Sequence, residues 1–224
     1  VLLKRIDGHA LLVNNLVIDK ADVNSQTQVS GGSILIKNNK PTGVLIDKAM
    51  DLAMRILPPS SDREIAKALV EAEKRAFENG LTTVDDAGLD KRIIQAIDSL
   101  HEIEELKIRV YAMISNTSKN LNYFLDKGII ENEKLTVRSV KAYLDGALGS
   151  RGALLKNPYY DDKNNKGITI TSKEDLFELA DQLSSKGFQL NTHAIGDKAN
   201  EIVLDVYNYI LKDVKDPRWR VEHA

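Results

Sequence analysis

Three side chains that can take part in metal chemistry lie near the ends of three successive predicted strands. They are Lys141, His193 and His223. In parallel α/β folds the reactive groups gather at the carboxyl ends of the strands. Burying such polar groups costs free energy unless they are paired or ligated, and imidazole nitrogen is a ligand that Zn²⁺ prefers. The spacing therefore favours a site for a divalent metal of the zinc type.

Lys141 fits such a site only in a neutral or modified form. An ammonium group repels a cation, whereas a lysine that has reacted with carbon dioxide carries a carbamate, which acts as a carboxylate and can bridge two ions. Strand alternation would place Tyr143 and Asp145 on the same face as Lys141. We therefore expect Asp145 to orient the metal-binding group, with an Asx turn before Gly146 as the alternative role.

Strands and helices alternate from about residue 81 onward, and these elements must position the three residues. The pattern predicts strands at 81–84, 107–115, 135–145, 188–194 and 219–223, and helices at 62–79, 90–106, 120–127, 172–186 and 197–211. Such a βαβ rhythm predicts an α/β fold with a parallel sheet. An open doubly wound sheet and a closed (β/α)8 barrel both fit it.

Residues 1–57 lack this rhythm. Residues 32–37 and 41–47 can pair as a hairpin, and Pro58-Pro59 interrupts the chain before the first long helix. We expect 1–57 to form a cap or insertion and 58–224 to form the αβ body. An apolar start and a strand-like end also lead us to expect a piece of a longer protein.

The composition excludes several classes of protein. The 224 residues carry 31 Lys and Arg against 33 Asp and Glu, so a nucleic-acid partner bound mainly by electrostatic attraction is not expected. No apolar stretch approaches the ~18 residues of a membrane span, and no signal peptide is recognisable. The lack of cysteine fits a cytoplasmic protein. We expect a small-molecule substrate, and open sheet edges would favour a homo-oligomer.

Several motifs, taken in order, resemble the amidohydrolase superfamily. They are KAYLDGALGSRGA at 141–153, HAIGD at 193–197 and EHA at 222–224, supported by DGHA at 7–10, GG at 31–32 and PTGV at 41–44. The set is most similar to the amidohydrolase 3 group, which includes YtcJ-like and N-substituted formamide deformylase-like enzymes. This resemblance covers nearly the whole chain.

The resemblance implies a (β/α)8 TIM-barrel metallohydrolase with one or two divalent ions, commonly zinc. It implies hydrolysis of a carbon–nitrogen bond other than a peptide bond, through a metal-bound hydroxide. Lys141 matches the family's carboxylated lysine, and His193 and His223 match its metal histidines on the next two strands. These three are the predicted metal-binding and catalytic residues. His9 matches a wall of the substrate pocket. Arg151 lies in a loop where it could hold substrate or make a structural contact.

The family pattern is incomplete in this chain. Members also carry an H-x-H pair on barrel strand one and an aspartate on strand eight, and no H-x-H occurs here. We therefore expect an incomplete barrel covering about strands two to six, with 1–57 inserted between strand one and its helix. The isolated chain is expected to be inactive, so the predicted activity is that of the parent enzyme.

Two other functions fit the same residues. A lyase on the same barrel would use Lys141 as a Schiff-base amine with Asp145 as its proton partner. In a non-catalytic scaffold the histidines would be hydrogen-bonded core residues. Among the neighbouring acidic residues, Glu222 is predicted to face the helix layer, and Asp197 is predicted to cap the helix that follows it.

Overall fold

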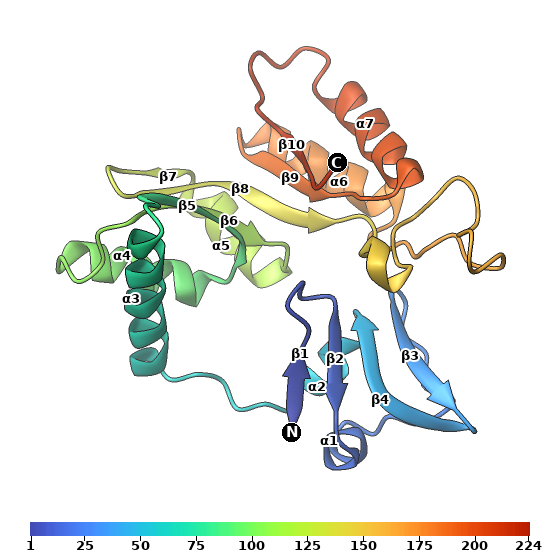
Figure 1. Ribbon diagram of the computed structural model, residues 1–224. Coiled ribbons are helices and arrows are strands. Elements are labelled where there is room, and N and C mark those ends of the chain that lie inside the picture. Colours follow the sequence, from blue (N-terminus) through green and yellow to red (C-terminus); the bar gives the residue numbers. More distant parts are fainter.

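The computed structural model describes residues 1–224 as two sheets with helices packed against them (Figure 1). The first, which we call the antiparallel sheet, has four strands in the order β1-β2-β4-β3. Its strands and helices are β1 (Leu2–Lys4), β2 (Ala10–Val13), α1 (Asn15–Lys20), β3 (Gly32–Lys37), β4 (Lys40–Asp47) and α2 (Met50–Met54). β3 and β4 form the hairpin predicted at 32–47. Asn38 and Asn39 at its turn both adopt the left-handed conformation that a two-residue hairpin loop favours.

The second sheet, which we call the curled sheet, has five parallel strands in the order β10-β9-β8-β6-β5, and the short β7 pairs antiparallel with β8. The strands are β5 (Thr83–Leu89), β6 (Arg109–Ser115), β7 (Ile130–Glu131), β8 (Leu135–Tyr143), β9 (Gln189–His193) and β10 (Arg220–Glu222). The helices are α3 (Asp62–Glu78), α4 (Lys91–Glu102), α5 (Ser118–Lys127), α6 (Lys173–Ser185) and α7 (Asp197–Ile210). None of them combines the length and apolarity that a membrane crossing requires.

A contact between the two edges of the curled sheet reveals how strongly it bends. Arg220 on β10 places Nη1 2.9 Å from Oδ2 of Asp85 on β5, although β10 and β5 are the outermost strands. The sheet therefore closes part of the way round, as half of a barrel does. This confirms the predicted α/β class and the parallel sheet.

The ends of the predicted elements differ from the observed ones by a few residues. The largest difference is at β5, which was expected to end at residue 84 but continues through Asp85 and Asp86 to Leu89. Charged residues are tolerated there because this edge strand is largely exposed. β8 ends at Tyr143, two residues before the end that the sequence predicts.

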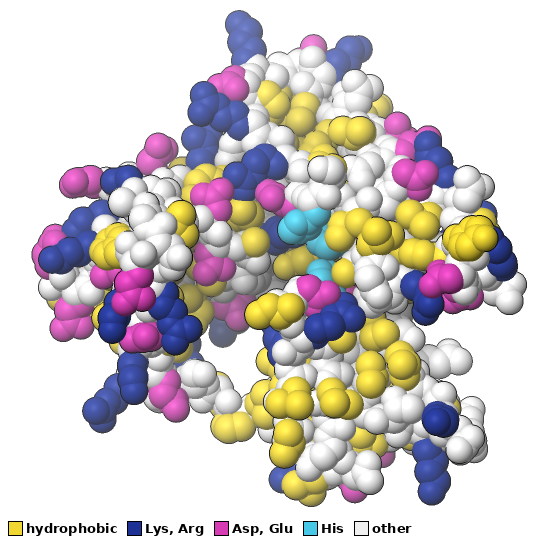
Figure 2. Space-filling view, in the orientation of Figure 1, with side chains coloured by type: hydrophobic (Ala, Val, Ile, Leu, Met, Phe, Trp, Pro, Cys, Tyr) yellow, Lys and Arg dark blue, Asp and Glu magenta, His cyan; other side chains and the backbone are white.

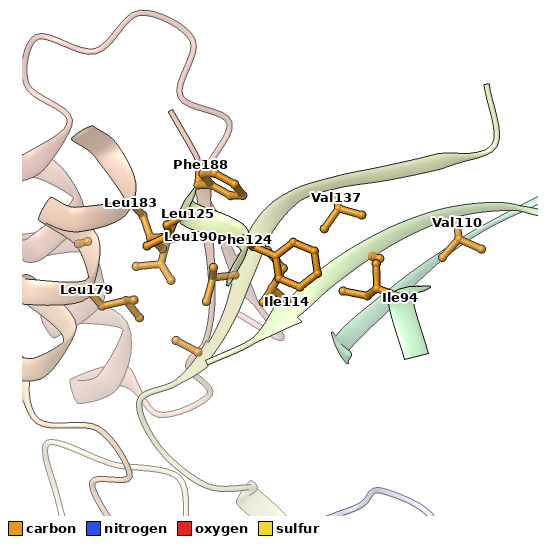
Figure 3. Close-up of a cluster of buried hydrophobic side chains, with 14 of the residues drawn as sticks. Ile94, Val110, Ile114, Phe124, Leu125, Val137, Leu179, Leu183, Phe188 and Leu190 are labelled. Carbon is orange, nitrogen blue, oxygen red and sulfur yellow. The ribbon is translucent and has the colours of Figure 1, made fainter. Parts of the chain in front are cut away.

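The core lies between the parallel strands and their helices. It contains 26 buried hydrophobic residues, and Figure 3 shows Phe124 from α5 beside Ile114 of β6, with Leu190 of β9 and Leu183 of α6 nearby. Burying each large apolar side chain stabilises the fold by roughly 1.5–3 kcal/mol. The antiparallel sheet has a separate cluster of nine buried residues, among them Leu45. The two sheets thus have distinct hydrophobic cores.

A bulge in β8 decides which way Lys141 points. Leu135 and Val137 belong to the core under the helices, so simple alternation would send Lys141 there as well. The register with β6 shifts between Thr136 and Ser139, and Val140 then takes the core side. Lys141 therefore lies on the concave face of the curled sheet.

Candidate functional site

The structure brings Lys141, His193 and His223 together at the carboxyl ends of neighbouring strands. His193 is the last residue of β9, and His223 directly follows β10. The centroids of these two imidazole rings are 4.9 Å apart. Lys141, on β8, holds Nζ 3.9 Å from the ring centroid of Tyr143, whose ring is in turn 5.4 Å from that of His193. The predicted convergence of the three side chains is thus present in the fold.

Lys141 is a buried amine without a carboxylate partner. Its Nζ donates only a long hydrogen bond, 3.4 Å, to the carbonyl of Ala142, besides lying over the Tyr143 ring. Burial lowers the pKa of Lys141 to about 8, and the charge of Glu222 acts in the opposite direction without cancelling this effect. A substantial fraction of this amine is therefore neutral, and hence nucleophilic, slightly above neutral pH.

His193 is a neutral imidazole, and one of its ring nitrogens makes no hydrogen bond. Its side chain is 1% exposed, and Nε2 lies 3.4 Å from the carbonyl oxygen of Gly146 and 3.5 Å from Oδ1 of Asp145. Burial, helped by the charge of Lys141, lowers the pKa of His193 to about 3. With Nε2 facing these oxygens, the buried Nδ1 has no hydrogen-bond partner.

An unpaired, buried nitrogen on a neutral imidazole is a suitable donor for a divalent metal, so the residues fit the ion that the sequence predicts. His223 is less buried, and desolvation together with the charge of Lys141 lowers its pKa. In this chain alone, no group of three or more His, Cys, Asp or Glu side chains is arranged to hold a metal ion. The chain therefore offers two imidazoles and one amine, rather than a complete ligand set.

Asp145 ties the loops around the site together instead of facing Lys141. The strand ends before it, so the predicted alternation does not apply. Its fully buried carboxylate accepts hydrogen bonds from the backbone N–H groups of Leu154, Ile195 and Gly196 at 2.8, 3.0 and 2.8 Å. Burial raises the pKa of Asp145, and these donors partly offset the rise. Asp145 thereby fixes the turn after His193. Of the three site residues, His193 is the one that Asp145 contacts.

Glu222 corrects a prediction, because it does not face the helix layer. Its Oε1 pairs with Nε of Arg220 at 2.9 Å on the concave face, and its charge acts on Lys141. The reason is that β10 ends at Glu222 and His223 adopts a left-handed conformation, φ 73°, so the predicted alternation does not continue, and Val221 takes the core side instead.

Two further residues that the sequence analysis singled out make contacts with loops. Arg151 lies outside the cluster, where its exposed guanidinium pairs with Asp161 at 2.7 Å in the loop between β8 and α6. Asp197 does not cap α7, because Gly196 occupies the cap position. As the first residue of the helix, Asp197 instead accepts a hydrogen bond from the N–H of Lys156.

Sequence reasoning missed Asp47, which lies at the end of β4 and holds His9. Oδ1 of Asp47 is 2.6 Å from Nδ1 of His9, and the His9 ring centroid is 5.2 Å from that of His193. His9 is thus the one predicted site residue that the antiparallel sheet contributes. Figure 2 shows histidine side chains gathered where the two sheets meet. The pairing joins residues 38 positions apart, so no local pattern could have indicated it.

A cavity of about 400 Å³ lies beside this contact, between the antiparallel sheet and the curled sheet. Its lining includes His9 and Asp47 from one side and Tyr143 and Ile170 from the other, with Met50 at the start of α2. Lys48 helps to join the two sides by donating a hydrogen bond to the carbonyl of Ile170. The cavity is therefore built by both sheets, next to His193.

We expect Gly196→Ala to destabilise the full-length protein by about 1–3 kcal/mol, because a Cβ there would overlap the backbone of Leu154. Gly149→Ala is the matched control, since a Cβ at Gly149 would meet no atom within 4 Å. Urea unfolding monitored by circular dichroism measures both changes. Equal midpoints for the two variants would contradict the close packing of these loops.

Comparison with known proteins places the chain among amidohydrolases. The protein LONG AFTER FAR-RED 3 of Arabidopsis thaliana is 35% identical over 242 residues, covering 100% of this chain and 41% of that protein. The putative amidohydrolase YtcJ of Bacillus subtilis (strain 168) is 33% identical over 212 residues, covering 92% of this chain and 40% of that protein. The chain thus spans about two fifths of the length of these curated relatives.

Solved structures agree on the fold. The crystal structure of an uncharacterized metal-dependent hydrolase from Pyrococcus horikoshii OT3 superposes with a TM-score of 0.72 at 24% identity, covering 93% of this chain and 42% of that one. A second such hydrolase, from Pyrococcus furiosus, gives a TM-score of 0.69 at 24% identity, covering 94% and 43%. The amidohydrolase family model matches residues 1–224. The chain therefore belongs to the amidohydrolase family, in its amidohydrolase 3 group.

Proposed function

We propose that the whole protein is a metal-dependent hydrolase that cleaves carbon–nitrogen bonds, other than peptide bonds, in small amide or formamide-like substrates. One observation carries the proposal, namely the meeting of His193, His223 and Lys141 at neighbouring strand ends, with Nδ1 of His193 buried and unpaired. Family membership supports it, as do the names of the relatives, one a putative amidohydrolase and two metal-dependent hydrolases.

In this proposal His193 and His223 would hold a divalent ion, and Lys141, as a carbamate, would supply a further carboxylate-like ligand. Zinc is the ion that best suits these imidazoles, and one or two ions fit the set. When bound, such an ion acts as a Lewis acid toward the substrate carbonyl and lowers the pKa of water. The chain's own contribution is to hold the two imidazoles neutral and to keep His193 in place through Asp145.

The proposal also concerns the rest of the protein. The curled sheet would form strands two to six of a (β/α)8 barrel, with residues 1–57 as a cap between strand one and its helix. The H-x-H pair and the strand-eight aspartate of the family would come from outside residues 1–224. The isolated chain would then turn over no substrate, because about half of the ligands would be missing.

The test is a metal and mass measurement on the full-length protein. We expect one or two zinc ions per chain, a native mass higher by about 44 Da from the carbamate on Lys141, and loss of amide hydrolysis on treatment with a chelator. Activity that survives the chelator, together with trapping of Lys141 by borohydride and a carbonyl substrate, would instead establish the Schiff-base lyase. A metal content left unchanged in His193→Ala would establish the scaffold alternative.

A further inference from the structure

We propose that a cavity at the amino-terminal end of the curled sheet binds a small oxyanion, a carboxylate or a phosphate group, through Arg138 and Arg218. The cavity has a volume of about 360 Å³, and three arginines are among the residues that line it. Lys141 and the two site histidines are not part of its lining. This inference does not depend on the proposed hydrolase function, so either can fail without the other.

The cavity lies at the opposite end of the parallel strands from Lys141 and His193. Its lining includes Gln189, the first residue of β9, and Thr136, the second residue of β8. His193 is the last residue of β9. Since a strand advances by about 3.3 Å per residue, the backbone of Thr136 is roughly 16 Å from that of Lys141 along β8. The cavity is therefore separate from the candidate metal site.

The bulge in β8 presents Arg138 to this cavity. The register with β6 shifts between Thr136 and Ser139, so Val137 and Arg138 together oppose one residue of β6. Val137 packs in the core under the helices, whereas Arg138 lines the cavity. An irregularity of this kind re-aims a side chain, and bulges are frequent next to functional sites.

Arg138 has no partner for its charge within the chain. Its Nε is buried and makes no hydrogen bond. Unlike Arg218 and Arg220, it forms no ion pair. A guanidinium stays protonated in proteins, and all of its N–H groups are donors. A buried, charged donor without an acceptor costs free energy, and an oxyanion that accepts from it removes this cost. The missing partner of Arg138 is therefore a negatively charged acceptor.

Arg218 can supply the second guanidinium. Its loop is fastened to β9, because Nε2 of Gln189 donates to the carbonyls of Pro217 and Arg218 at 3.4 and 3.2 Å. Arg218 pairs with Asp216, and both side chains are 69% exposed, so this pair is worth less than about 1 kcal/mol. Arg218 can thus exchange Asp216 for a ligand. Arg220 adds little, because two carboxylates at 2.9 Å already balance its charge.

Glu131 limits which anions can bind. It also lines the cavity, and the pairing of β7 with β8 places it opposite Thr136, two residues from Arg138. Its carboxylate repels an anion, so the net attraction comes from Arg138 and Arg218. A small anion with one or two charges fits this balance, and the hydroxyl of Thr136 offers it a further donor.

The test follows the Nε–H resonance of Arg138 in ¹H–¹⁵N spectra of the full-length protein, assigned by its disappearance in Arg138→Gln. Sodium phosphate or, separately, sodium acetate is added at constant ionic strength, which keeps general screening unchanged. Because such anions can also bind a metal ion, following Arg138 itself reports on the cavity alone. We expect a saturable shift, and the anion that binds more tightly identifies the ligand as a phosphate or a carboxylate. Arg109 is the internal reference, since its guanidinium bonds to Thr82 and Thr83 outside the cavity.

Two variants should change the affinity in opposite directions, which a loss of folding would not do. We expect Arg218→Gln to weaken binding about tenfold, because one of two charge-assisted contacts is lost. We expect Glu131→Gln to strengthen binding about threefold, because the repulsion of a neighbouring carboxylate is removed. Arg109→Gln is the matched control and should leave the affinity unchanged.

The inference is overturned if Arg138 shows no saturable shift with either anion, or if Arg109 shifts equally. Weaker binding by Glu131→Gln also overturns it, since the ligand would then need that carboxylate, as a zwitterion would. The proposed hydrolase stands in each case, because the cavity includes none of the three site residues.

Discussion

Asp145→Ala is expected to lower the free energy of unfolding of the full-length protein by about 3–5 kcal/mol, and to release metal with it. The fully buried carboxylate of Asp145 accepts hydrogen bonds from three backbone N–H groups of two different loops, one of them buried and two partly buried. Alanine would remove the acceptor of all three donors, and the N–H of Gly196 would be left buried and unsatisfied. The turn after His193 would then lose its anchor, and the imidazole would lose its fixed orientation.

The measurements are urea unfolding and zinc content of the purified protein. Asp145→Asn retains one acceptor oxygen, so we expect a smaller loss of stability than for alanine. Asp161→Ala is the control, because Asp161 makes an exposed ion pair with Arg151, which is worth less than about 1 kcal/mol. An Asp145→Ala protein as stable as this control would show that the three hydrogen bonds do not organise the loops.

Lys141→Ala is expected to reduce amide hydrolysis by more than about 100-fold, because a ligand is lost and not merely a neighbour of one. The truncation leaves space beside the Tyr143 ring where the buried amine had been. If the lysine acts as a carbamate, formate or acetate can occupy that space and restore part of the activity. If it acts as a Schiff-base amine, ethylamine and not acetate should restore it.

The measurement is kcat with increasing concentrations of each additive. Lys91→Ala is the matched control, since its ammonium also lies over a tyrosine ring, 3.5 Å from the centroid of Tyr123, but in the helix layer. We expect full activity from that variant. Recovery with neither additive, or with ethylamine alone, would refute the carbamate role of Lys141.

The sequence was sufficient to predict the parallel strands and the placement of Lys141, His193 and His223 near neighbouring strand ends. The predicted strands at 188–194 and 219–223 end near His193 and His223, and parallel strands bring such ends to one edge of a sheet. In the structure His193 is in register with Glu222, the residue before His223. The resemblance to the amidohydrolase 3 group added the roles, and the family is confirmed.

The rest depends on contacts that no local pattern contains. The bulge in β8 reverses the face on which Lys141 lies, and it follows from the register with β6 rather than from the residues of β8 themselves. The contact of Arg220 with Asp85 joins residues 135 positions apart, and the side of the sheet on which Glu222 lies follows from Val221 packing against the core. The dyad of His9 and Asp47 likewise forms only when β2 and β4 pair and bring their ends together.

The separation of the two hydrophobic cores has a consequence for how such proteins diversify. No buried apolar residue is shared between the 26-residue cluster and the nine-residue cluster, and the junction described above is made by polar groups such as Asp47 and Lys48. Mutations that accumulate in one core therefore require no compensation in the other. Related proteins can therefore change the cavity wall around Met50 while His193 and His223 stay the same. Substrate preference can then evolve without a change in the proposed metal site.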